Sequence, residues 1–577
     1  MFDHRTIRRS AEFERIRAIP RRAWTPAQMD ECARYYTGKL RTPAGTWTLR
    51  PLQAVALHEI ATVGGLLGPI RVGGGKTLLS LLAPRLVGAV RPVLLLPAAL
   101  VDKTRREMGI LMAHWAIPRN IQIQSYEMLG RENAANFFQI AHPDFIFADE
   151  AHRLKNARAG VTRRVARWMH EHPETRFAAV SGTLLKDDLR DFAHLAGWAL
   201  KAWAPVPLEK GEISEWADCL APPKNPMARM EPGPLLSLAT PDDAREAMGD
   251  THTLARLGFR RRLRETPGVV ASGDEHVACS LLIRGETYDV NATTEANFRT
   301  LRTAWETPDG WALSQAVDVW RHARELALGF HYVWDPRPPR EWIEARREWA
   351  ALVREILSSS HTLDTELQVS REYGHTAEFR RWEAVRPTFQ IQPRAIWHDP
   401  TALDLCAAWM RKGPGIVWVD HAFFGHELSR RTGVPYFGEQ GQDVVRGTPI
   451  EQADPKGSII ASGRANSTGR NLQAWARNLF TSAPAGAPEW EQRLGRTHRD
   501  GQEADEVIAD VLFGCREHFE ALERALIAAR ANVQTMGHAQ KLLLADIATP
   551  DEWAIREWAR TSYRWRKSAG NGREGEG

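Results

Sequence analysis

Cysteine is scarce in this sequence, and its few positions are far apart. The five cysteines are Cys32, Cys219, Cys279, Cys406 and Cys515, and no two have the spacing of a metal-ligand pair or a local disulfide. Apolar runs of membrane-span length are also missing, and the basic N-terminus has no apolar signal core. These absences argue against a disulfide scaffold, a cysteine metal site and a membrane protein, and they predict a protein of the reducing cytoplasm.

A strong excess of charge of one sign is absent too. The net charge is +5 over 577 residues, so any surface that binds nucleic acid must be a local groove rather than a global field. The length predicts three or four domains. Tryptophan is abundant, with 22 residues, and we expect most of these side chains to anchor helix packing rather than to stack on bases.

The pattern along the chain predicts an α/β protein with two sheet-containing lobes. Between residues 46 and 204, short apolar strands alternate with helical stretches, which indicates a parallel sheet with crossover connections. Residues 401–530 return to the same order. We expect strands at 92–96, 121–124, 145–148 and 177–180 in the first lobe, and at 415–419 and 458–461 in the second.

Three other regions differ in character from the lobes. Residues 1–45 are basic and predict a partly helical lead-in. Residues 205–400 combine proline clusters with long charged helical stretches and predict a mainly helical insertion. Residues 531–577 predict a helix followed by a flexible tail.

A glycine-rich turn precedes an apolar helical stretch. It consists of Gly73, Gly74, Gly75, Lys76 and Thr77. Glycine lets the backbone turn tightly, so that amide groups can point at phosphate oxygens, and the helix N-terminus adds partial positive charge. In such a loop the lysine reaches the β- and γ-phosphates and the threonine hydroxyl binds magnesium. A plain glycine turn is the alternative, because the full pattern has a further glycine where Ile70 stands.

The expected strand at 145–148 ends in Asp149 and Glu150. Carboxylates at the carboxyl end of a buried parallel strand lie in the crevice where α/β sheets bind ligands. We expect Asp149 to hold magnesium and Glu150 to polarise an attacking water. The alternative is an exposed acidic turn.

Two arginines near the end of the chain complete a possible hydrolytic set. Arg496 and Arg499 follow Gln492 in a segment expected to be a short helix, where one turn places both arginines on one face. A nucleotide hydrolase combines a phosphate cradle, a magnesium carboxylate, a water-orienting group and an arginine finger. The sequence contains candidates for all four, and the alternative for the arginines is a solvated basic helix.

The motifs together resemble a known family. Residues 149–156 read DEAHRLKN and residues 492–502 read QRLGRTHRDGQ. With the glycine-rich turn, they resemble superfamily-two helicases, and more narrowly a compact, bacterial or phage-like form of the Swi/Snf-type DNA translocases. The resemblance covers roughly residues 46–200 and 415–513. The sequence departs from the family's usual residues at Ile70, Arg71, Leu184, Asn466 and Ser467.

The resemblance implies roles for further residues. Gln53 matches the adenine-reading glutamine, and Gly469 and Gln492 match nucleotide-binding positions of the second lobe. Coupling between the ATP site and movement is implied for His152, Ser181, Gly182 and Thr183. Nucleic-acid contacts are implied for Pro97, Ser125, Tyr126 and Thr468, and also for the basic cluster Arg260, Arg261 and Arg262, whose alternative is a solvated helix face.

The implied fold has two RecA-like lobes, of which the first binds ATP and Mg²⁺. The implied activity is ATP hydrolysis that drives movement on duplex DNA, independent of base sequence. Other readings stay open: a strand-separating helicase acting on DNA or RNA, a non-catalytic scaffold with a decayed ATPase fold, and an unrelated phosphate-loop ATPase. The presence of Lys76, Glu150 and both arginines argues against the decayed scaffold.

Overall fold

Short apolar strands build two separate parallel sheets in the computed structural model of the chain. The structure describes residues 5–70, 74–182, 184, 188–221, 230–272, 279–360, 362–390, 392–467, 469–499, 501–537 and 539–547. The chain divides into two compact units. The first comprises Met1–Asp274, Glu344–Arg386 and Arg530–His538, and the second comprises Glu275–Ile343, Pro387–Ala529 and Ala539–Gly577.

The first unit contains a five-stranded parallel sheet in the order β1-β5-β4-β2-β3. Its strands are β1 (Leu66–Gly68), β2 (Pro92–Leu96), β3 (Gln122–Ser125), β4 (Phe145–Asp149) and β5 (Arg176–Val180). The four strands expected from the sequence in this lobe are confirmed, within one residue at each end. The three-residue β1 was not predicted, because it is too short to show a periodic pattern.

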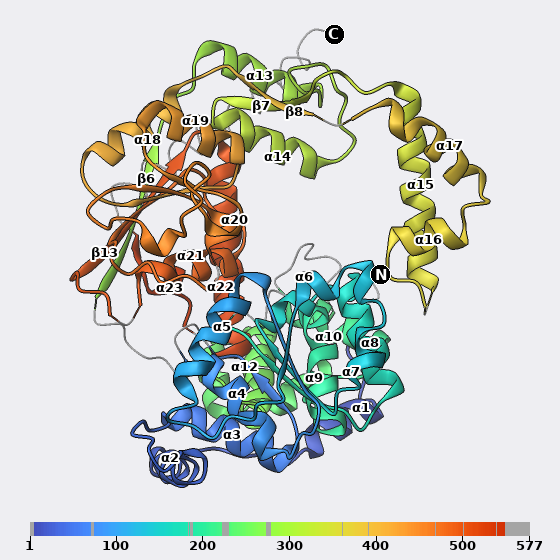
Figure 1. Ribbon diagram of the computed structural model, residues 1–577, viewed down its shortest axis with the longest axis vertical. Coiled ribbons are helices and arrows are strands. Elements are labelled where there is room, and N and C mark those ends of the chain that lie inside the picture. The colour runs from blue at the N-terminus through green and yellow to red at the C-terminus, as the bar shows by residue number, and fades with distance from the viewer. Residues whose placement is uncertain are drawn as a thin grey trace. The chain divides into compact units, whose positions relative to one another are not determined.

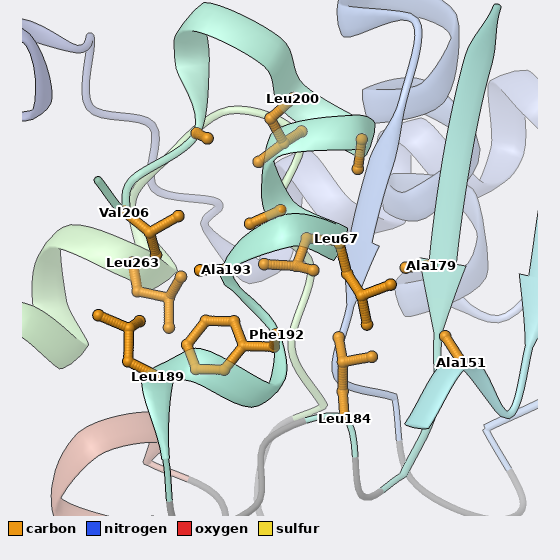
Figure 2. Packing of buried hydrophobic residues seen from close by; sticks show 14 of the residues in the cluster. Leu67, Ala151, Ala179, Leu184, Leu189, Phe192, Ala193, Leu200, Val206 and Leu263 are labelled. Atoms are coloured by element: carbon orange, nitrogen blue, oxygen red, sulfur yellow. The ribbon is translucent and has the colours of Figure 1, made fainter. Parts of the chain in front are cut away.

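Alternation of side chains along these strands covers both faces of the sheet with apolar residues. The buried cluster on one face includes Leu67, Val93, Leu95, Ile146, Ala148, Phe177 and Ala179. The buried cluster on the other face includes the neighbouring positions Leu66, Leu94, Leu96, Phe145, Phe147, Ala178 and Val180. Figure 2 shows part of the first cluster, where Leu67 and Ala179 lie with Phe192, Leu200 and Leu263. Both faces are therefore buried, as in other all-parallel sheets.

Helices of the first unit surround this sheet (Figure 1). They are α1 (Ala11–Ala18), α2 (Pro26–Leu40), α3 (Pro51–Val63), α4 (Lys76–Leu86), α5 (Ala98–Leu111), α6 (Tyr126–Leu129), α7 (Phe137–Ala141), α8 (Gly160–Glu171), α9 (Ala193–Leu200), α10 (Lys210–Leu220), α11 (Pro241–Ala247) and α12 (Thr251–Arg264). Buried Trp216 of α10 and Phe259 of α12 belong to the same apolar cluster as the sheet. Residues 205–264, expected to begin the helical insertion, are thus part of the first unit.

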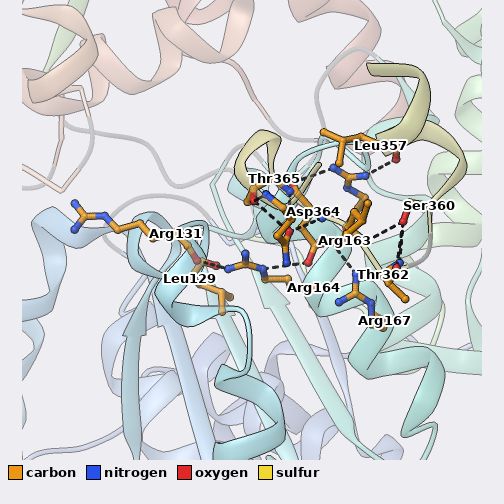
Figure 3. A network of polar contacts seen from close by, with 12 residues as sticks. Leu129, Arg131, Arg163, Arg164, Arg167, Leu357, Ser360, Thr362, Asp364 and Thr365 are labelled. Atoms are coloured by element: carbon orange, nitrogen blue, oxygen red, sulfur yellow. Dashed lines mark hydrogen bonds and ion pairs between the residues drawn. The ribbon is translucent and has the colours of Figure 1, made fainter. Parts of the chain in front are cut away.

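A segment that is distant in sequence docks on α8 through a buried carboxylate (Figure 3). The side chain of Asp364 is 1% exposed. It accepts from Arg164 Nε at 3.3 Å and from Arg167 Nη2 at 2.8 Å. Arg163 donates to the main-chain carbonyl of Asp364 at 3.1 Å. Three arginines of α8, Arg163, Arg164 and Arg167, therefore converge on one aspartate of the 344–386 segment.

The second unit contains a seven-stranded parallel sheet in the order β10-β11-β9-β12-β13-β6-β14. Its strands are β6 (Ser280–Thr287), β9 (Ile416–Val419), β10 (Tyr436–Phe437), β11 (Ile459–Ser462), β12 (Arg477–Phe480), β13 (Glu506–Phe513) and β14 (Asp546–Ile547). The two expected strands, β9 and β11, are confirmed. The fold class is accordingly α/β with two parallel sheets.

Residues 205–400 supply more than helices. Strand β6 pairs along its whole length with β13, and β7 (Phe330–Trp334) forms an antiparallel pair with β8 (Pro393–Trp397). The helices from α13 onward are α13 (Ala292–Thr303), α14 (Ala316–Ala327), α15 (Arg340–Ser359), α16 (Glu366–Glu372), α17 (Ala377–Val385), α18 (Thr401–Arg411), α19 (Ala422–Thr432), α20 (Gly463–Asn466), α21 (Ala487–Thr497), α22 (Arg516–Met536) and α23 (Lys541–Leu544). The region expected as one insertion is therefore shared between the two units.

Several tryptophans between residues 205 and 410 are buried as expected, whereas Trp305 and Trp334 are exposed. Trp342, Trp349, Trp382 and Trp409 are buried, and Trp349 donates to Glu366 at 2.7 Å. Among the described residues, none of the helices is long and apolar enough to cross a membrane.

Candidate nucleotide site

The glycine-rich turn leads directly into the first turn of α4. Gly75 adopts a left-handed conformation with φ 73°, and Lys76 begins the helix. A Cβ atom on Gly75 would lie 1.9 Å from Nε2 of Gln53, which donates to the Gly75 carbonyl at 3.3 Å. The left-handed backbone conformation favours glycine here, and a Cβ atom would displace the Gln53 side chain. The structure thus brings Gln53 of α3 to the turn, while Gly73 lies outside the described residues.

The carboxyl ends of three adjacent strands place the acidic residues beside this turn. Gly68 of β1 and Asp149 of β4 both pair with Val180 of β5. Lys76 is buried, and its Nζ lies 3.4 Å from the Ile70 carbonyl and 3.5 Å from Oε1 of Glu150. The lysine and the acidic pair predicted from separate motifs therefore share one site at the carboxyl edge of the sheet, where α/β proteins bind ligands.

A chain of polar contacts continues from Glu150 to the expected coupling residues. The Ser181 hydroxyl donates to Oε2 of Glu150 at 3.1 Å, and Nδ1 of His152 lies 2.9 Å from that hydroxyl. His152 stands in the 3-10 turn Ala151–Leu154, and Ser181 directly follows β5. Gly182 follows Ser181 in a turn, and Thr183 lies outside the described residues.

The electrostatics of the site favour a bound cation. Burial, reinforced by the adjacent Glu150 carboxylate, raises the pKa of Asp149 well above its ordinary range, and Lys76 opposes this only in part. Two buried carboxylates beside one lysine leave a negative charge that a divalent ion would neutralise.

Few protein ligands are needed for magnesium on a nucleotide, since phosphate oxygens and waters fill most positions. Thr77, which follows Lys76 in α4 and is half-buried, and Asp149 would suffice. Among the described residues, no group of three or more histidine, cysteine, aspartate or glutamate side chains could hold a metal by itself.

The structure contradicts a direct nucleic-acid contact for Tyr126. Its side chain is buried, and its hydroxyl donates to the Asp149 carbonyl at 2.7 Å. Ser125, which is also buried, caps α6 by accepting from the Met128 amide at 3.1 Å. Pro97 precedes α5 and is buried as well. The apolar pattern of the flanking strands did not predict that Tyr126 is buried, because its burial depends on the packing of Tyr126 against β4.

Two of the three clustered arginines make partly exposed ion pairs, and the third is internal. Arg261 binds both carboxylate oxygens of Asp243, and Arg260 pairs with Glu246. Arg262 is fully buried and donates to the carbonyls of Ile19 and Pro20. A phosphate contact by Arg262 is therefore wrong. Its guanidinium instead satisfies carbonyl groups just after α1, which lie more than 240 residues earlier.

In the second unit, the expected helix with two aligned arginines ends too early. Helix α21 ends at Thr497, so Arg499 lies beyond it and does not share a helical face with Arg496. Arg496 is buried and donates to the carbonyls of Gln492 and Arg470. Arg499 donates to Oδ1 of Asn471 at 2.6 Å. The alignment expectation is wrong, but both arginines contact the 463–473 segment.

That segment contains the other expected nucleotide residue of this unit. Gly469 has φ 73°, a conformation that favours glycine, and Thr468 beside it lies outside the described residues. Buried Asn466, one of the residues at which the sequence departs from the family pattern, donates to the Phe437 carbonyl at 2.9 Å. The amide nitrogen of Asn466 is therefore satisfied internally, whereas its buried Oδ1 has no hydrogen-bond partner among the described residues.

Sequence reasoning missed the ion pair between Asp420 and Arg493. Arg493 lies on α21, three residues before Arg496. Arg493 Nη2 contacts Oδ1 of Asp420, and Ser482 donates to Oδ2 at 3.3 Å. Arg493 lowers the pKa of Asp420 despite the burial that raises it. Asp420 directly follows the apolar strand β9, so the signal that found Asp149 could have found it too.

No protein-family model matches the chain, and the comparison with curated proteins likewise gives no match.

Proposed function

We propose that this protein is an ATP-driven translocase on duplex DNA, of the type that its motifs resemble, with two RecA-like lobes. The observation that carries the ATPase part is the linked set Lys76, Glu150, Ser181 and His152 at the carboxyl edge of the first sheet. A solvated acidic turn would not bury a lysine and two carboxylates together. The DNA part is supported by the sequence resemblance alone.

Each residue of the first unit has a definite task in this proposal. Lys76 and the amides of the glycine turn bind the β- and γ-phosphates, and Gln53 holds the turn through the Gly75 carbonyl. Asp149 and Thr77 would hold the nucleotide's Mg²⁺, which would supply positive charge beside the phosphate oxygens. Glu150 orients and polarises the attacking water. Ser181 and His152 fix the Glu150 carboxylate and connect it to the residues that follow β5.

Arg496 and Arg499 supply positive charge from the second unit in this proposal. Their guanidinium groups stabilise the transferring phosphoryl group during hydrolysis. Repeated closure and opening of the lobes would then move the protein along a phosphate backbone. Binding to DNA through phosphates would be insensitive to base sequence and sensitive to salt.

Two variants test the ATPase site. Lys76→Ala should abolish ATP hydrolysis, since the lysine is the mobile cation of the turn. Glu150→Gln should retain nucleotide binding and slow hydrolysis by orders of magnitude, because the water loses its polarising carboxylate. Glu174→Gln, which changes an exposed carboxylate of the same unit, is the control. Equal losses of binding and turnover in Glu150→Gln would assign Glu150 a structural role.

A second set of assays tests the nucleic acid. ATPase rates are compared without nucleic acid and with duplex DNA, single-stranded DNA and RNA at matched salt. We expect the strongest stimulation by duplex DNA, together with triplex displacement and little unwinding of a forked duplex. Unwinding of the fork without triplex displacement would replace the translocase by a strand-separating helicase.

A further inference from the structure

The hydroxyl of Tyr126 reaches the acidic pair from outside the sheet. Tyr126 is the first residue of α6, and its side chain is 5% exposed. Its hydroxyl donates to the main-chain carbonyl of Asp149 at 2.7 Å. This bond joins residues 23 positions apart in the chain, and it involves the backbone of Asp149 rather than its carboxylate.

The peptide unit between Asp149 and Glu150 is held at both ends. Its carbonyl accepts from Tyr126, and its amide group donates to Oδ1 of Asp149 at 2.9 Å. Glu150 follows in a left-handed conformation, with φ 52° and ψ 46°. A residue with a side chain seldom adopts this conformation, and it persists where the surroundings determine it. The two hydrogen bonds are such a determinant.

The conformation of Glu150 decides where its carboxylate lies. From the left-handed turn, Oε2 accepts from Ser181 and Oε1 lies 3.5 Å from Nζ of Lys76. If these bonds were lost and Glu150 left the left-handed conformation, its side chain would be directed away from both partners. The Tyr126 hydroxyl is therefore placed to control the carboxylate without touching any substrate.

We propose that Tyr126 is a positioning residue for the hydrolytic step, holding the Asp149–Glu150 peptide so that the Glu150 carboxylate points into the site. This inference rests on the proposed ATPase function. It assigns Tyr126 a role different from the nucleic-acid contact that the sequence suggested.

Tyr126→Phe removes only the hydroxyl, and the chain offers a matched control. Tyr288 of the second unit is also buried, and its hydroxyl donates to the Ala327 carbonyl at 2.7 Å. Tyr288→Phe therefore deletes the same kind of bond away from the candidate site. Tyr126→Phe should lower kcat about tenfold or more, as expected for a lost buried hydrogen bond. The Kd for a non-hydrolysable ATP analogue should stay within about twofold, and Tyr288→Phe should leave kcat unchanged.

A double variant separates positioning from a general loss of structure. If Tyr126 acts through Glu150, then Tyr126→Phe combined with Glu150→Gln should be no slower than Glu150→Gln alone. Hydrogen exchange of residues 145–152 should be faster in Tyr126→Phe than in Tyr288→Phe. Additive losses of kcat in the double variant, or unchanged exchange and kcat in Tyr126→Phe, would overturn the inference. Absence of ATPase activity in the wild-type protein would instead overturn the proposed function and, with it, this role.

Discussion

Asp364→Ala should release the 344–386 segment from the first unit. The Asp364 side chain is 1% exposed and that of its partner Arg164 is 2% exposed, so neither charge is screened by water. Removing one member of a buried ion pair costs about 3–5 kcal/mol, because the other charge stays buried. Arg167 loses its carboxylate partner as well. Since each 1.4 kcal/mol is about a tenfold change in an equilibrium constant, the equilibrium constant for local opening of this segment should rise by about a hundredfold or more.

Hydrogen exchange measured on peptides from α8 and from residues 357–368 is the appropriate assay, because it reports local opening. The control is Asp218→Ala, which breaks an exposed pair with Arg190 in the same unit and should cost no more than about 1 kcal/mol. Asp364→Asn keeps an acceptor and should fall between the two. Equal exchange in Asp364→Ala and Asp218→Ala would refute the reasoning and show that carbonyl groups alone satisfy the arginines.

Gly75→Ala should weaken nucleotide binding, because the new Cβ would displace the Gln53 side chain from the turn, whereas Gly88→Ala, also at positive φ but with open space around it, should bind normally; equal binding by both variants would contradict this. Arg496→Ala should lower kcat about a thousandfold or more with little change in ATP affinity, and normal turnover would exclude a finger role. Burial raises the pKa of Asp243, but the hydrogen bonds from Arg261 and Thr240 and the charge of Arg261 together outweigh it and lower this pKa to about 2. Since this pKa lies below its ordinary value, the stabilisation by the Asp243 carboxylate is complete above about pH 4 and is lost as the pH falls through 2. The urea concentration at the unfolding midpoint should therefore fall less steeply between about pH 4 and pH 2 in Asp243→Asn than in the wild-type protein.

Local sequence signals were sufficient for the strands that are apolar along their whole length. Strands β2 and β4 are continuous buried runs bounded by turns or polar residues, and the structure has them where the pattern predicts. Strand β6 could not be found in this way, because its buried and partly exposed positions alternate irregularly and its partner β13 lies more than 200 residues later. Strand pairing over such a distance leaves no local trace.

The candidate site was predictable where a residue's role follows from its own segment. The Lys76–Glu150 contact combines two motifs that each have a recognisable spacing. The fates of Tyr126 and Arg262 were not predictable, because each is buried against backbone carbonyls from another part of the chain. A side chain's type shows what it can donate, but only the tertiary fold determines which acceptor it meets.

The docking of Asp364 on α8 also constrains the order of events on the ribosome. Arg164 and Asp364 are 200 residues apart. At about 5–20 residues per second, the aspartate is synthesised about 10–40 s after the arginine. The first sheet and α8 can form during this interval, but the arginines of α8 then face water or a chaperone rather than their carboxylate. The contact between α8 and Asp364 therefore forms only after Glu275–Ile343 of the second unit has been synthesised.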